Sequence, residues 1–187
     1  MPKQTEFQKV IKSLGIDETN YIKPTKYKFD TVKANTFPMG GYNFMADSIK
    51  LPKTRYGYEY LLVVVDLWSD AIDFEQMTSV KSINAVKALQ KIISRPYLNL
   101  PKASIRTDGG PEFKKHFNEF LEDNKIAHRT SLPYRHKQQA NVESANRSIG
   151  RILMEYLGNK EQELGRVYRQ WTDILPQVRE ALNKYRL

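Results

Sequence analysis

The pattern of apolar and polar residues between positions 42 and 77 predicts three consecutive strands. The segment YNFMADSIK (42–50) alternates apolar and polar side chains, which is typical of a strand with one buried face. YEYLLVVVD (58–66) is a continuous apolar run suited to the centre of a sheet, and AIDFEQM (71–77) follows after a short polar turn. Because short turns separate the three segments, we expect them to pair as antiparallel strands.

Helical and strand patterns alternate in the rest of the chain. Apolar residues recur at helical spacing over 83–93, and ASIRT (103–107) then indicates a fourth strand. A helix is expected to begin at Pro111, IAHRTS (126–131) indicates a fifth strand, and 142–156 carries another apolar helical face. A last helical region over 167–182 contains Pro176, which should bend or split it.

This order of elements predicts an α/β fold. Three antiparallel strands followed by two strands that alternate with helices make a five-stranded mixed sheet, with helices packed on its faces. Residues 1–40 are polar and rich in Lys, so we expect them to form an N-terminal appendage or linker arm. Residues 41–187 should form the core domain.

Composition narrows the chemistry and the compartment. The 187-residue chain has no Cys, which excludes disulfides, Cys-containing zinc sites and thiol catalysis. The spacing of His116, His128 and His136 does not suit a zinc site either. The longest apolar run, residues 60–65, is far shorter than the roughly 20 residues of a membrane span, and the N-terminus lacks an apolar signal region. We expect a protein of the nucleus, cytoplasm or virion that is neither secreted nor bound to a membrane.

The net charge of +9 is concentrated near the end of the chain. Residues 124–187 carry 12 basic and 6 acidic groups, and a single acid, Glu143, lies among the basic residues between Asn124 and Met154. Such a stretch is either solvated surface or a binding surface for a polyanion such as nucleic acid.

Three carboxylates occupy positions where a metal site can form. Asp47 lies inside the first predicted strand, Asp108 follows the fourth strand directly, and Glu143 lies in the first turn of a helix. An Asp at a strand end is often only a turn residue, but clustered carboxylates repel one another unless a cation compensates them. Mg²⁺ prefers oxygen ligands, and two such ions roughly 3.5–4 Å apart can activate the attacking oxygen and stabilise the leaving oxygen at phosphorus.

Three sequence motifs resemble the catalytic core of the retroviral-type integrase family, found in retroviruses, LTR retrotransposons and Maverick/Polinton-type elements. Around Asp108 the chain has T-D-G-G-P-E-F, and Glu143 lies ten residues after Pro133 and begins E-S-A-N-R. The phrases LLVVVDLWSDAIDFEQM and WTDILP also resemble that family. The resemblance covers about 42–185 and implies a ribonuclease H-like fold, in agreement with the order of elements above.

The resemblance also implies an activity. The chain would be a polynucleotidyl transferase that processes the 3′ ends of an element's DNA and joins them to target DNA. Asp47, Asp108 and Glu143 would be the catalytic residues and would hold two Mg²⁺ or Mn²⁺ ions, with Asp47 bridging both. Its partners would be element-end DNA, target DNA and further copies of the chain, as a homodimer or larger homo-oligomer.

Polar and basic residues beside Glu143 are expected to contact DNA, although ordinary solvated charge is the alternative for them. These residues are Arg135, Lys137, Gln139, Asn146, Arg147 and Arg151. Asp66 is the rival of Asp47 as the first ligand, but it ends its strand, and we favour Asp47. Two other functions remain open: a nuclease of the same fold that cuts without joining, and an inactive DNA-binding or assembly module. We also expect the chain to be part of a longer protein, because the zinc-binding domain common in the family is not visible in it.

Overall fold

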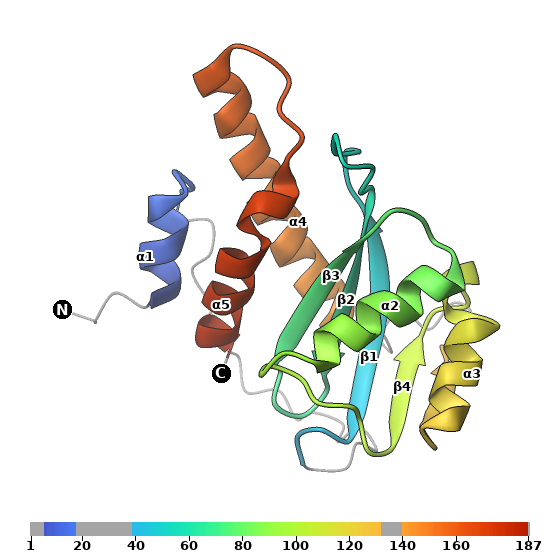
Figure 1. Ribbon diagram of the computed structural model, residues 1–187. Helices are drawn as coiled ribbons and strands as arrows, with labels where there is room; N and C mark the ends of the chain where they lie inside the picture. Colours follow the sequence, from blue (N-terminus) through green and yellow to red (C-terminus); the bar gives the residue numbers. More distant parts are fainter. Residues whose placement is uncertain (1–5, 18–38, 132–139, 187) are drawn as a thin grey trace.

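A five-stranded mixed sheet forms the centre of the fold, as predicted. The computed structural model describes residues 6–17, 39–131 and 140–186. The strands are β1 (Asn43–Lys50), β2 (Tyr60–Asp66), β3 (Ile72–Met77), β4 (Ser104–Thr107) and β5 (Ala127–Thr130). They lie in the order β3-β2-β1-β4-β5 (Figure 1). The first three pair antiparallel, and β4 pairs parallel to both β1 and β5.

Helices cover both faces of the sheet (Figure 1). Alternate residues of β1 and β2 point to opposite faces. Met45 and Val63 contribute to one core with α4 (Ala140–Leu164) and α5 (Leu175–Arg186). Phe44 and Leu62 contribute to the other core with α2 (Ser82–Ile93) and α3 (His116–Asp123).

Several helix boundaries differ from the predicted ones. The helix expected to begin at Pro111 is split into a 3₁₀ turn, η2 (Pro111–Phe113), and α3, because the backbone φ of 40° at Lys115 between them is incompatible with a continuous helix. The last helical region starts later than predicted. Val167 is 68% exposed in a loop, and η4 (Trp171–Ile174) leads into α5, where Pro176 lies near the helix start and does not break it.

The N-terminal segment contributes to the core. α1 (Glu6–Ser13) packs against α5, with Phe7 and Ile11 buried and the ring of Phe7 centred 4.5 Å from that of Tyr185. Residues 1–40 were predicted as an appendage from their polar composition, although Phe7, Val10, Ile11 and Leu14 have helical spacing in the sequence. The described part of that segment is packed, and the division of the chain at residue 40 stays a prediction.

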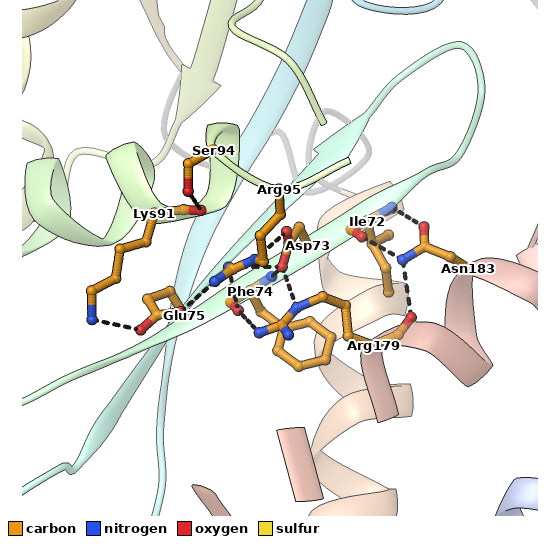
Figure 2. A network of polar contacts seen from close by, with 9 residues as sticks. All are labelled: Ile72, Asp73, Phe74, Glu75, Lys91, Ser94, Arg95, Arg179 and Asn183. Carbon is orange, nitrogen blue, oxygen red and sulfur yellow. Dashed lines mark hydrogen bonds and ion pairs between the residues drawn. The ribbon is translucent and has the colours of Figure 1, made fainter. Parts of the chain in front are cut away.

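Buried ion pairs close the free edge of the sheet at β3 (Figure 2). Asp73 is fully buried and accepts hydrogen bonds from Arg95, at the end of α2, and from Arg179 of α5, each within 2.8 Å. Both guanidinium groups also donate to the carbonyl of Phe74, at 3.2 and 2.8 Å. Asn183 brackets the backbone of Ile72, accepting from its N–H at 2.9 Å and donating to its carbonyl at 2.7 Å. Side chains therefore occupy the positions that a neighbouring strand would take.

Replacing Arg179 with Met should lower the free energy of unfolding by about 3 kcal/mol. Asp73 would remain buried with Arg95 as the one partner left of its two arginines. Urea denaturation monitored by circular dichroism measures this loss. Lys160→Met is the control: it removes an ion pair with Glu163 on the surface of α4 and should leave stability nearly unchanged. A loss for Arg179→Met as small as that of the control would show that the pair does not hold the edge.

Candidate active site

Parallel pairing of β1 with β4 brings Asp47 and Asp108 side by side. In the register of the two strands Met45 lies opposite Arg106, so the same register continued by two residues sets Asp47 opposite Asp108. Adjacent strands are about 4.8 Å apart. Asp47 lies inside β1, opposite Val63 of β2, as predicted, and Asp108 directly follows β4. The sheet therefore brings these two carboxylates close together, and the charge of Asp108 acts on Asp47.

Glu112 is a third carboxylate at this site, and the sequence analysis did not select it. It lies in η2 and is only 5% exposed. The hydroxyl of Ser48, next to Asp47, donates to Glu112 Oε1. Its position in T-D-G-G-P-E-F was a usable signal, but a Glu after Pro111 also suits the first turn of an ordinary helix.

Gly110 allows the two loop carboxylates to approach each other. A Cβ atom at this position would lie 2.6 Å from Glu112 Oε2 and 2.9 Å from Asp108 Oδ1, closer than real Cβ contacts. The backbone N–H of Gly110 also donates to Asp108 Oδ1 at 3.0 Å. Any side chain at residue 110 would therefore displace one of these carboxylates.

The concentration of negative charge perturbs Asp47. Burial is the largest cause that raises the pKa of its carboxyl, and the charges of Asp108 and Glu112 raise it as well, while two hydrogen bonds lower it. The net effect of these causes raises the pKa from 3.8 to about 6. Those bonds come from the backbone N–H of Ser48, at 2.8 Å, and from Nδ2 of Asn146, at 2.8 Å. The site therefore holds more negative charge than its hydrogen-bond donors compensate.

Asn146 offers a further oxygen to the site. Its Nδ2 is used by Asp47, while its Oδ1 is buried and has no hydrogen-bond partner in the described part of the chain. An uncompensated buried acceptor is costly, and a cation or a donor from a ligand would relieve it. Asn146 was predicted to contact DNA, whereas the structure places its amide on Asp47.

Glu143 lies in the first turn of α4, three residues before Asn146, so both occupy one flank of that helix. The side chain is half-buried. The structure does not bring all three predicted ligands together: within residues 6–17, 39–131 and 140–186, no group of three His, Cys, Asp or Glu side chains is arranged to hold a metal ion. The role of Glu143 as a ligand therefore stays a prediction.

The predicted DNA contacts divide into two groups. Arg147 and Arg151 are exposed on α4, on the turns that follow Glu143. Arg135, Lys137 and Gln139 lie outside the described residues, as does His136. The roles of all five side chains in DNA binding stay predictions.

Asp66, the rival first ligand, is engaged in a turn. Its carboxylate accepts hydrogen bonds from the backbone N–H of Gly41 at 2.7 Å and of Trp68 at 3.0 Å, and from the Ser69 hydroxyl at 2.8 Å. Three donors on a side chain that is 3% exposed leave little capacity for a metal ion. This geometry favours Asp47 over Asp66.

His128 supports the backbone beside Asp108. The Thr107 hydroxyl donates to the carbonyl of Asp108 at 2.7 Å, and His128 Nε2 lies 2.8 Å from that hydroxyl. The other ring nitrogen of His128 contacts Asn118 of α3. Burial lowers the pKa of His128. This histidine is therefore committed to a hydrogen-bonded chain that steadies the end of β4.

Comparisons with known proteins agree on one family. Residues 44–136 match the integrase core domain family. Over 105 residues, 54% of this chain, the sequence is 33% identical to the Gag-Pro-Pol polyprotein of human T-cell leukemia virus 2. Over 132 residues, 70% of this chain, it is 28% identical to a transposon-derived protein of Caenorhabditis elegans. The matches span 7% and 43% of these two relatives.

Solved structures show the same fold. The catalytic core domain of BIV integrase superposes with a TM-score of 0.59 at 21% identity, covering 79% of this chain and 87% of that one. The HTLV-2 integrase catalytic core domain, in complex with magnesium, gives 0.56 at 23% identity, covering 76% and 85%. Within the described residues, no helix is both long and apolar enough to cross a membrane. The chain belongs to the family of integrase core domains of retroviral type, and its sheet and helices form the ribonuclease H-like fold of that family.

Proposed function

We propose that this chain is the catalytic core of a DNA integrase, a metal-dependent polynucleotidyl transferase that processes element DNA ends and joins them to target DNA. The observation that carries the proposal is the position of Asp47 inside β1 and of Asp108 directly after β4, the parallel neighbour of β1, where the charge of Asp108 raises the pKa of Asp47. Repulsion between clustered carboxylates destabilises a protein that has only a structural role. A metal site needs these carboxylates close together, because they are the ligands of the cation.

The residues present suit a hard divalent cation. Asp47 and Asp108 supply carboxylate oxygens, and the unpartnered Oδ1 of Asn146 is a neutral oxygen on the same side of the sheet. In this proposal Asp47, Asp108 and Glu143 hold two Mg²⁺ or Mn²⁺ ions. The HTLV-2 core domain has been solved with magnesium, which supports this choice of metal. When bound, the ions would activate the attacking oxygen and stabilise the leaving oxygen at phosphorus.

The protein's own residues provide rigidity and orientation. Asn146 and the backbone N–H of Ser48 fix both oxygens of Asp47. Gly110 and Thr107 fix the carboxylate and the carbonyl of Asp108. Positioning of this kind matters in metal sites, where loss of a supporting hydrogen bond typically costs about 10–100-fold in affinity or activity.

Assembly into oligomers is part of the proposal, because two DNA ends must be joined in one event. The HTLV-2 core has been solved in dimeric and trimeric forms, and the related simian virus protein in an intasome. Since the chain spans less than half of the relatives it matches, the activity of the whole protein also belongs to this proposal.

A strand-transfer assay with pre-cut DNA ends, a target duplex and Mg²⁺ or Mn²⁺ tests the proposal. The intact chain should join the ends, and Glu143→Gln and Asp47→Asn should each reduce joining by more than about 100-fold, because each removes a ligand. Asp66→Asn should keep part of the activity, since Asp66 bonds only to its own turn.

Joining that survives Glu143→Gln would contradict the mechanism. An inactive Asp66→Asn variant beside an active Asp47→Asn variant would reverse the assignment of the first ligand. Metal-dependent cleavage without joining would identify a nuclease, and DNA binding with neither reaction would identify an inactive module.

The raised pKa of Asp47 gives a second prediction, for the metal-free protein in EDTA. Because the folded state binds this proton more tightly than the unfolded chain does, the contribution of Asp47 to stability should be largest below pH 4 and be lost as the pH rises through about 6. The full shift corresponds to a penalty of about 3 kcal/mol at pH 8. Asp47→Asn removes that penalty, so the variant should unfold at a higher urea concentration than the wild type at pH 8 but not at pH 4.

The exposed Asp123→Asn serves as the matched control and should show no such pH-dependent gain. Adding Mg²⁺ should stabilise the wild type at pH 8 and leave Asp47→Asn unaffected. Equal stabilities of wild type and Asp47→Asn at pH 8 would show that Asp47 carries no electrostatic penalty.

A further inference from the structure

Two segments that are far apart in the sequence line a basic groove just beyond the C-terminal end of β1. One wall is the β1–β2 loop with Lys53, Thr54 and Arg55, and the other is the connector between α4 and η4, residues 166–170. The groove has a volume of about 490 Å³. We call it the basic groove.

The charge of the basic groove is of one sign. Lys53, Arg55, Arg166 and Arg169 line it, all four are exposed, and no carboxylate is among the lining residues. Within the part of the chain that the structure describes, none of the four forms an ion pair. Arg55 stacks on the ring of Tyr56, 4.6 Å from its centre, which orients the guanidinium without neutralising it. Two carboxylates contact the lining residue Tyr168: Glu161 accepts a hydrogen bond from its backbone N–H at 3.0 Å, and Asp173 accepts one from its hydroxyl at 3.2 Å. The four cations outnumber these acids and favour an anionic ligand with several charges.

The two walls are fastened to each other. Trp171 Nε1 donates to the carbonyl of Pro52 at 2.7 Å, and the backbone N–H of Arg55 donates to Oε1 of Gln170 at 3.4 Å. Trp171 is fully buried and Gln170 is 9% exposed. Contacts between residues more than 100 positions apart therefore hold the two segments that carry the cations next to each other.

The groove also lies within reach of the carboxylates. Lys53 follows Asp47 by six residues along β1 and its loop, a path of at most about 20 Å. Figure 1 shows the β1–β2 hairpin rising beside the C-terminal half of α4, beyond the ends of β1 and β4. Duplex DNA advances 3.4 Å per base pair, so 20 Å corresponds to about six base pairs.

We propose that the basic groove binds the phosphodiester backbone of duplex DNA, within about six base pairs of the strand held at Asp47 and Asp108. This inference rests on the proposed function, in which DNA binds at Asp47 and Asp108. The contact would be independent of base sequence, because side chains that meet phosphates read charge and spacing. It would lengthen the DNA footprint of the core beyond the surface around Glu143.

Fluorescence anisotropy of a labelled 20-base-pair duplex, titrated in EDTA at several salt concentrations, tests this inference. The variant Arg166→Ala/Arg169→Ala should bind about 10-fold more weakly, and the slope of log K against log salt should flatten by about 1.8, since each lost phosphate contact contributes about 0.9. Two duplexes of unrelated sequence should be affected equally. Lys53→Ala/Arg55→Ala, from the opposite wall, should behave in the same way.

The matched control is Lys81→Ala/Lys87→Ala, which removes two exposed charges at α2, on the other face of the sheet. Its salt slope should stay within about 0.5 of the wild type. The groove variants should lose less affinity for a 12-base-pair duplex than for the 20-base-pair duplex. The shorter duplex does not reach both the basic groove and the carboxylates in every position in which it binds. Thermal unfolding confirms that each variant is folded.

Unchanged salt slopes in both groove variants would overturn the inference. So would a selective loss of binding to poly-glutamate with duplex binding intact, which would identify an acidic protein as the partner. Joining activity tests the proposed function separately from binding. Asp47→Asn should bind the duplex with the wild-type salt slope but should not join it. If the wild type joins DNA but the groove variants bind DNA normally, only the proposal for the groove is rejected. If the groove variants bind DNA more weakly but the wild type does not join it, only the integrase activity is rejected.

Discussion

The repulsion between Asp47 and Asp108 is the constraint around which this end of the molecule is organised. Asp47 lies in β1 and Asp108 directly follows β4, the parallel neighbour of β1, so the two carboxylates are close enough for the charge of Asp108 to raise the pKa of Asp47. Glu112 adds a third negative charge, and the pKa of Asp47 rises to about 6 as it becomes buried among them. A cation site needs like charges held rigidly together. The free energy of folding offsets the repulsion between these carboxylates before a cation binds.

The rest of the fold provides the rigidity that this arrangement requires. On one side of the sheet, Arg95 and Arg179 close the edge of β3 through Asp73, and α5 in turn supports α1. On the other side, His128 and Thr107 steady the end of β4. β1, which carries Asp47, and β4, which Asp108 follows, are inner strands of the sheet and are paired on both sides.

Patterns local in the sequence predicted most of the fold. The alternating and continuous apolar runs located β1, β2 and β3, and Asp47 lies inside a strand and Asp108 directly after one, as the sequence predicted. Non-local contacts account for what was missed. Glu112 became part of the site through Ser48, 64 residues away, and Asn146 through Asp47, 99 residues away, so their roles depend on tertiary packing. The packing of α1 and the break at Lys115 depend on neighbours and backbone geometry in the same way.

The most direct test of the account is the position of a bound metal ion. Crystals of the full chain soaked in Mn²⁺ and measured at the manganese absorption edge should show an anomalous peak about 2.0–2.3 Å from carboxylate oxygens of both Asp47 and Asp108. The same peak should be absent from crystals of Asp47→Asn. A peak confined to other carboxylates, or no peak between Asp47 and Asp108 at saturating Mn²⁺, would contradict the claim that the sheet holds this pair for a metal ion.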